Sequence, residues 1–121
     1  MKVAIATKND VVADPGECEE IHFFDLKDGT YILLKKIENP GKAAKAAKGV
    51  VMLRSALENG ADAIIVNEIG RPGVNYLKGK AKIFLANGMS IEDAIHAVSS
   101  GKLKETEEPT HEGGHREHRE L

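Results

Sequence analysis

The sequence predicts an α/β fold in a single domain, with a mixed five-stranded sheet flanked by helices. The chain has 121 residues, of which 41% are apolar and 30% are charged, a size and composition typical of one globular domain. Strand-like runs follow one another in the first half, whereas short apolar runs alternate with helical patterns in the second half. The predicted order of elements is β-β-β-α-β-α-β-α.

The first half of the chain is predicted to form three strands. Residues 2–7 are short, apolar and partly β-branched, which is typical of a central strand. Residues 20–26 and 30–37 are strand-like and are separated by Lys27-Asp28-Gly29, so they are predicted to pair as a hairpin. The stretch Glu38-Asn-Pro-Gly41 then ends the strand pattern.

The second half is predicted to alternate helices and strands. From residue 43 onward the apolar period changes from 2 to 3.6, which predicts a helix that ends at the cap pair Asn59-Gly60. Residues 63–66 are predicted to be a buried strand, because a short apolar run suits a parallel strand covered on both faces. The remaining predicted elements are a short helix over 72–77, a strand over 81–85 and a helix over 91–100, with right-handed crossovers.

Composition narrows the class of function. No apolar run reaches the roughly 18 residues that a membrane span needs, and the N-terminus has no signal-peptide pattern, so a cytoplasmic protein without membrane contact is expected. The net charge of −2 argues against a general nucleic-acid binder. Cys18 is the only cysteine, which excludes an internal disulfide and a four-thiolate cluster within one chain.

Several local sequences occur in an order and spacing that carry a family resemblance. They are Met1-Lys-Val-Ala-Ile-Ala-Thr7, Asp25-Leu-Lys-Asp-Gly29, Glu38-Asn-Pro-Gly41, Gly60-Ala-Asp-Ala-Ile-Ile-Val66, Ile69-Gly70, Met89-Ser-Ile-Glu-Asp-Ala-Ile95 and Gly101-Lys-Leu103. Together they resemble the dinitrogenase iron-molybdenum cofactor biosynthesis family over about residues 1–104. The resemblance implies a ribonuclease H-like fold and a non-catalytic binding or carrier protein for an iron-sulfur or molybdenum-containing cofactor. It also implies cofactor-assembly proteins as partners.

The chain departs from this family's pattern at three places. At the entry to the long helix many members have Gly and His, whereas this chain has Lys42-Ala-Ala-Lys45-Ala-Ala-Lys48-Gly49. Members usually carry His-Phe-Gly-Arg after the first strand, whereas this chain has Asp14-Pro15-Gly16-Glu17-Cys18, so the family's candidate histidine ligand is absent. Asn67-Glu68 stands where members often have two small residues. These substitutions set the candidate site of this chain apart from that of similar proteins.

Three loops, over residues 15–18, 42–49 and 67–73, are expected to converge at one edge of the sheet, because ligands of α/β folds bind where parallel strands end. In these loops lysines could attract an anion, an arginine could clamp a phosphate or carboxylate, glycines could let a ligand approach the backbone, and a thiol could bind iron or copper. The candidate cofactor-binding residues are Gly16, Cys18, Lys45, Lys48, Asn67, Glu68, Gly70, Arg71 and Gly73. The alternatives are that the lysines form a solvated helix face, that residues 67–73 form an ordinary strand-to-helix turn, and that Cys18 is incidental.

The end of the chain has a different composition. Residues 105–121 are rich in histidine, glutamate and arginine and poor in apolar side chains, so they are predicted to form a mobile tail after a domain that ends at residue 104. His111, His115 and His118 follow one another at spacings of 4 and 3, which suits a divalent metal such as zinc or nickel. A solvated charged tail is the alternative.

A carrier without catalytic activity is the leading hypothesis. A two-metal nuclease normally has a carboxylate in the middle of the first strand, and this strand reads Val3-Ala-Ile-Ala6. The sequence also has no Gly-x-Ser-x-Gly elbow and no visible Ser-His-Asp set, so a hydrolase is not expected. The alternatives are a sensor of small anions or nucleotides, using Gly70, Arg71 and Gly73 with Lys45, and a protein-interaction module.

Overall fold

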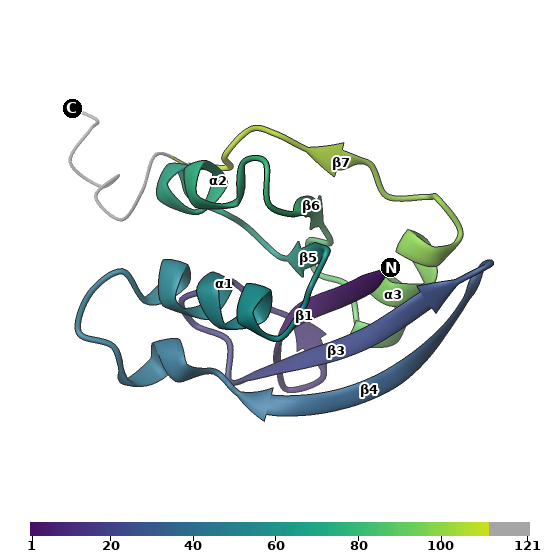
Figure 1. The fold of residues 1–121 in the computed structure, drawn as a ribbon, viewed down its shortest axis with the longest axis horizontal. Helices are drawn as coiled ribbons and strands as arrows, with labels where there is room; N and C mark the ends of the chain where they lie inside the picture. The colour runs from purple at the N-terminus through teal and green to yellow at the C-terminus, as the bar shows by residue number, and fades with distance from the viewer. Residues whose placement is uncertain (112–121) are drawn as a thin grey trace.

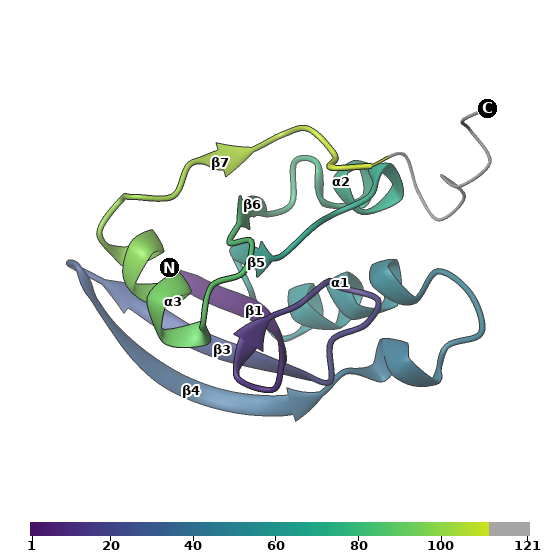
Figure 2. The same cartoon turned by 180° about the vertical axis from the view of Figure 1, so that it is seen from behind.

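The structure is a computed structural model that describes residues 1–111. Within these residues a mixed sheet of seven strands is covered by helices on both faces (Figures 1 and 2). The strands are β1 (Lys2–Lys8), β2 (Val11–Val12), β3 (Glu20–Lys27), β4 (Thr30–Glu38), β5 (Ala63–Val66), β6 (Lys82–Leu85) and β7 (Glu105–Thr106). The helices are the 3-10 helix η1 (Pro40–Ala43) and the α-helices α1 (Lys48–Glu58), α2 (Arg71–Leu77) and α3 (Ile91–Ser99).

The first strand lies in the interior of the sheet. The strand order is β4-β3-β1-β5-β6-β7, and β2 pairs with the end of β1. β1 is antiparallel to β3, with Val3 opposite Phe24, and parallel to β5, with Val3 opposite Ala63. Because β5 and β6 are also parallel, the carboxyl ends of β1, β5 and β6 meet at one edge, where the loops of the candidate site begin.

The mixed α/β sheet in one domain is confirmed, but the predicted count of five strands is wrong. The described residues contain two more strands, β2 and β7, with two residues each. Two residues are too few to produce an alternating pattern, so periodicity could not reveal them. The ribonuclease H-like assignment stays a prediction.

The two faces of the sheet carry separate hydrophobic clusters. On one face Ala4 and Ala6 of β1 pack in a cluster with residues of α1 and α2, including Leu53. On the other face Val3 and Ile5 pack in a cluster with residues of α3. β1 and β5 are therefore buried on both sides, which explains why their sequences are apolar without alternation. None of the helices in residues 1–111 has the length and apolarity that a membrane crossing requires.

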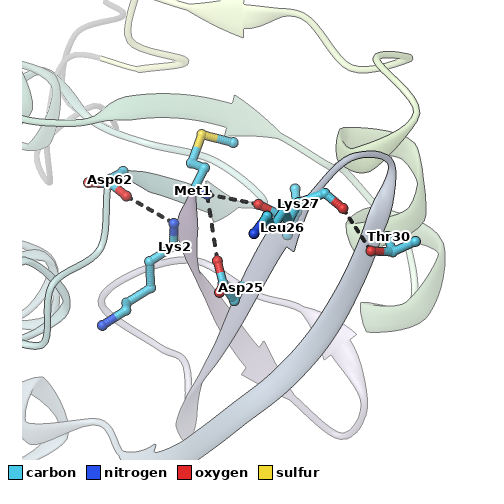
Figure 3. A network of polar contacts seen from close by, with 7 residues as sticks. All are labelled: Met1, Lys2, Asp25, Leu26, Lys27, Thr30 and Asp62. Atoms are coloured by element: carbon cyan, nitrogen blue, oxygen red, sulfur yellow. Dashed lines mark hydrogen bonds and ion pairs between the residues drawn. The ribbon is translucent and has the colours of Figure 1, made fainter.

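The predicted hairpin is confirmed, and the start of β1 is fixed beside it (Figure 3). Asp28 and Gly29 both have positive φ, 53° and 80°, as a two-residue turn between twisted strands requires. The N-terminal ammonium of Met1 donates a hydrogen bond to the Leu26 carbonyl at 2.8 Å and lies 3.6 Å from a carboxylate oxygen of Asp25. These contacts hold the first residue against the end of β3.

The long helix begins later than its periodicity predicts. The pattern from residue 43 predicts a continuous helix, but Pro40–Ala43 form η1 and α1 starts only at Lys48. Between them Ala44 is extended, and Ala47 has a left-handed conformation with φ 53° and ψ 40°. The alanine-rich sequence has high helix propensity, so contacts elsewhere in the fold override it here.

The chain continues along the sheet after residue 104, where the sequence analysis placed the end of the domain. Thr106 pairs with Ile83 of β6. Further on, Thr110 donates a backbone hydrogen bond to the Ile69 carbonyl at 2.8 Å. The remainder of the predicted tail, residues 112–121, lies outside the described residues.

Candidate functional site

A cleft of about 610 Å³ lies at the edge where β5 ends. One wall comes from the loop between β2 and β3, one from the start of α1, and one from the turn between β5 and α2. The lining residues are Asp14, Pro15, Gly16, Glu17, Ala47, Lys48, Gly49, Val50, Leu53, Glu68, Ile69, Gly70, Pro72, Gly73 and His111. Each of the three loops that the sequence analysis selected contributes to this lining.

The start of α1 offers backbone donors to the cleft. Its N-cap residue, Ala47, has no side chain that can accept from the first turn. The N–H groups of Lys48, Gly49 and Val50 donate to no hydrogen-bond acceptor within residues 1–111. Free N–H groups at a helix start, together with the positive end of the helix dipole, favour an anion.

Two glycines bring this helix start close to the loop before β3. A Cβ atom added to Gly16 would lie 3.5 Å from the Gly49 nitrogen, and one added to Gly49 would lie 3.5 Å from the Pro15 Cβ. The backbones therefore pack against each other without intervening side chains. A longer side chain at Gly16 would begin beside the Gly49 N–H group.

Asn39 fixes the relative position of these two segments. Its side chain is buried, donates to the carbonyls of Pro15 at 3.2 Å and Cys18 at 2.9 Å, and accepts from the Gly41 N–H at 2.8 Å. The same residue caps η1, which leads into α1. The sequence pattern of Glu38-Asn-Pro-Gly41 predicts the end of a strand, and an Asn-Pro-Gly sequence is also typical of the start of a 3-10 or α-helix.

The side-chain charges of the cleft are mixed. Three carboxylates line it, from Asp14, Glu17 and Glu68, against one ammonium from Lys48. Oδ1 of Asp14 is buried and has no hydrogen-bond partner within the described residues. The cleft therefore combines hydrogen-bond donors at the start of α1 with carboxylate acceptors on the other two walls. A ligand with both anionic and hydrogen-donating groups suits this arrangement.

Some predicted site residues lie outside this cleft lining. Lys45 is exposed and does not line the cleft. Oδ1 of Asn67 accepts from the Gly88 N–H at 3.2 Å, which ties the end of β5 to the loop before α3. Arg71 starts α2, and its N–H donates to the His111 carbonyl at 3.1 Å. His115 and His118 lie outside the described residues.

Cys18 is fully buried in the loop between β2 and β3. Its thiol lies 3.7 Å from the Pro15 carbonyl oxygen. Burial away from water raises the pKa of this thiol to about 12. In this position the side chain is neutral and does not line the cleft.

We expect Cys18 to resist alkylation by iodoacetamide in the folded protein. At about pH 8 a thiol with this pKa is ionised in about one molecule in 10⁴, and only the thiolate reacts. Labelling followed by mass spectrometry, in native buffer and in guanidinium chloride, measures this protection. Rapid labelling in native buffer would contradict the buried placement.

The buried thiol also makes stability depend on pH. The thiol ionises near pH 9.0 in the unfolded chain and at about pH 12 in the folded protein, so its ionisation lowers the free energy of unfolding as pH rises between these values.

A second, larger cleft of about 850 Å³ lies beside the ends of β1 and β4 and was missed by the sequence analysis. Its lining includes the buried polar side chains Thr7, His22 and Asn39. Thr7 donates to the Glu20 carbonyl at 3.0 Å, and His22 pairs with the Glu20 carboxylate at 3.0 Å. Because these buried groups already have protein partners, the first cleft is the stronger candidate.

The sequence model of the family described as "Dinitrogenase iron-molybdenum cofactor" matches residues 1–101. The chain belongs to this family. The family prediction is thereby confirmed. The match covers β1 to α3 and every residue that lines the cleft except His111. A search of curated proteins gave no match.

Solved structures of this family's fold resemble the chain over most of its length. The apo form of the orange protein from Desulfovibrio gigas has a TM-score of 0.74 at 14% identity, covering 90% of this chain and 95% of that one. A Thermotoga protein described as a candidate NifB protein has a TM-score of 0.69 at 27% identity, covering 93% and 98%. A candidate dinitrogenase from Methanocaldococcus jannaschii has a TM-score of 0.68 at 20% identity, covering 90% and 97%. The orange protein and the Methanocaldococcus protein show the shared fold. The family match and the Thermotoga protein support a cofactor-associated accessory role.

Proposed function

We propose that this chain is a non-catalytic carrier that binds an anionic iron-sulfur or molybdenum-containing cluster in the cleft at the start of α1. The cluster is cargo, held for transfer to cofactor-assembly proteins in the cytoplasm. The proposal rests on the N–H groups of Lys48, Gly49 and Val50, three residues that line the cleft and whose N–H groups have no acceptor within residues 1–111. Membership of the cofactor family supports the choice of cargo.

The cargo is bound without thiolate bonds from this chain. Cys18 is the only cysteine and is buried and neutral. The backbone N–H groups and the Lys48 ammonium instead contact the outer sulfur or oxygen atoms of a preformed anionic cluster. Glu17 and Glu68 repel the same charge, so the complex is reversible, as transfer to a partner requires.

Lys48→Glu is expected to weaken cluster binding at least tenfold. The change reverses a charge beside the anion, and about 1.4 kcal/mol of lost attraction corresponds to a factor of ten. A glutamate in the first turn of a helix does not threaten folding, because it complements the dipole. Anaerobic incubation with iron and sulfide, or with molybdate, copper and sulfide, followed by metal analysis of the gel-filtered protein, measures the bound cluster.

Lys27→Glu provides the matched control, since it makes the same charge change at the distant β3–β4 turn. Equal uptake by the wild type and the control, with reduced uptake by Lys48→Glu, supports the cleft. Equal loss in both variants would indicate only a long-range charge effect. No stoichiometric uptake by the wild type would contradict the carrier function.

A sensor of small anions or nucleotides is the second candidate, because the same free N–H groups suit phosphate oxygens. A thermal-shift series with inorganic phosphate and nucleotides separates the two. A ligand at 100 times its Kd stabilises the folded state by about 2.7 kcal/mol. Stabilisation by a phosphate compound without cluster uptake would favour the sensor. A protein-interaction module would respond to neither probe.

A further inference from the structure

Residues 44–47 connect η1 to α1 and project from the body of the domain (Figures 1 and 2). Lys45, Ala46 and Ala47 are exposed. Alanine and lysine are among the residues that favour a helix most, yet this segment is not helical. Its last residue, Ala47, has the left-handed conformation, with φ 53° and ψ 40°, which the Cβ atom of an L-residue disfavours. The segment therefore lacks the conformation that its own sequence favours.

The backbone groups without partners on either side of Ala47 are the donors and acceptors of one helical turn. The carbonyl groups of residues 44–46 accept no hydrogen bond within residues 1–111. In an α-helix each would accept from the residue four positions later, that is, from residues 48–50. The N–H groups of residues 48–50 are the donors without acceptors at the start of α1. The next bond of this series, from the Val51 N–H to the Ala47 carbonyl, is already formed at 3.0 Å.

The chain before Ala44 is long enough for this turn to form. Gly41 lies against Lys48, because a Cβ atom added to Gly41 would lie 2.5 Å from the Lys48 carbonyl oxygen. A helix that starts at Ala44 would place this residue about 6 Å along the axis from Lys48. The three steps from Gly41 to Ala44 span up to about 10 Å. The extension would break the bond from the Ala44 N–H to the Gly41 carbonyl, formed at 3.1 Å, and would form three.

We propose that residues 44–47 switch between the open turn seen in the structure and an additional turn of α1, and that this switch opens and closes the cleft. In the longer helix the N–H groups of residues 48–50 bond to carbonyl groups of α1 itself, and the positive end of the dipole moves about 6 Å along the axis. These donors are then unavailable to a ligand. An anion in the cleft and the additional turn therefore exclude each other, a consequence that rests on the proposed function.

Two substitutions of Ala47 bias the switch in opposite directions. Valine is β-branched and is disfavoured far more in the left-handed conformation than in a helix, so Ala47→Val should populate the longer helix. Glycine adopts the left-handed conformation without strain and weakens helices, so Ala47→Gly should hold the open turn. Ala46→Val is the matched control, because Ala46 is exposed and its φ is not positive.

NMR of the full-length protein measures the switch without any ligand. In Ala47→Val we expect helical Cα chemical shifts at residues 44–47, and amide hydrogen exchange of residues 48–50 that is about tenfold slower than in Ala47→Gly. Ala46→Val should keep the non-helical shifts of the wild type. Non-helical shifts in a folded Ala47→Val variant, or the same changes in Ala46→Val, would overturn the proposal.

A second measurement applies if Ala47→Val does not fold. Relaxation dispersion of the wild type detects exchange with a minor conformation on the microsecond to millisecond timescale. Exchange that is confined to residues 44–50 and is absent from Ala47→Gly would support the switch. No exchange at these residues would overturn it.

The effect on the cleft is measured by anaerobic incubation with iron and sulfide, or with molybdate, copper and sulfide. Ala47→Val should take up about fivefold less cluster than the wild type, and Ala46→Val should match the wild type. Equal uptake by Ala47→Val, together with its helical shifts, would overturn the closure of the cleft. No uptake by the wild type, together with the expected shifts, would contradict the carrier function and still support the switch.

Discussion

Asn39→Ala is expected to lower the free energy of unfolding by about 2–4 kcal/mol. The side chain makes three buried hydrogen bonds that join the loop before β3 to the start of η1. Its removal leaves the carbonyls of Pro15 and Cys18 and the Gly41 N–H without this partner, and each unsatisfied buried group costs about 1–3 kcal/mol. Urea unfolding followed by circular dichroism measures the change.

Asn59→Ala is the control for this experiment. Asn59 caps the end of α1, donates to the Ser55 carbonyl at 2.9 Å and accepts from Lys35 at an exposed site. Its loss should cost less than about 1 kcal/mol, because water can replace exposed partners. Equal losses for the two variants would show that Asn39 does not link the two segments as described.

Gly41→Ala is expected to lower the free energy of unfolding by about 2–3 kcal/mol. A Cβ atom here would lie 2.5 Å from the Lys48 carbonyl oxygen and 3.1 Å from Oδ1 of Asn39. The nearer atom is backbone in the first turn of α1, so it cannot rotate away as a side chain would. Relief of the clash requires η1 and α1 to separate. The same urea titration measures the effect, and chemical shifts of the Gly49 and Val50 amides report any displacement of the cleft.

Gly49→Ala is the matched control, because a Cβ there would make only ordinary contacts at 3.5 and 3.7 Å. It also lies within a helix, where alanine is favoured over glycine by about 1 kcal/mol. We therefore expect unchanged or slightly higher stability for Gly49→Ala. A stable Gly41→Ala variant with unmoved amides would contradict the close approach of η1 to α1.

The larger elements of the fold could be predicted because each has a pattern of its own. The β3–β4 hairpin follows from Lys27-Asp28-Gly29, and β5 follows from its uninterrupted apolar run. The late start of α1 could not be predicted, since Ala43 to Ala47 carry strong helix propensity. The structure instead turns there through an extended residue, Ala44, and a left-handed one, Ala47. The turn follows η1, whose cap residue Asn39 bonds to the loop before β3, a contact that local sequence does not encode.

The candidate site also has some features that the sequence predicts and others that it does not. Gly16, Lys48 and the turn after β5 could be selected because loops at the carboxyl ends of neighbouring strands must converge. The burial of Cys18 and the position of His111 could not be predicted, because both depend on contacts between segments distant in sequence. The role of Asn39 was missed for a related reason: its hydrogen-bond partners lie in another loop.

The central strand β1 pairs with strands that are near to it and far from it in the sequence. β3 and β4 meet across a two-residue turn, so their pairing is local and fast. Val3 pairs with Ala63, about sixty residues away. Closing such a long loop costs conformational entropy before the two strands can make stabilising contacts. We therefore expect the hairpin to form first and β5 to join β1 late. The cleft takes one wall from the turn after β5, so it is completed only near the end of folding.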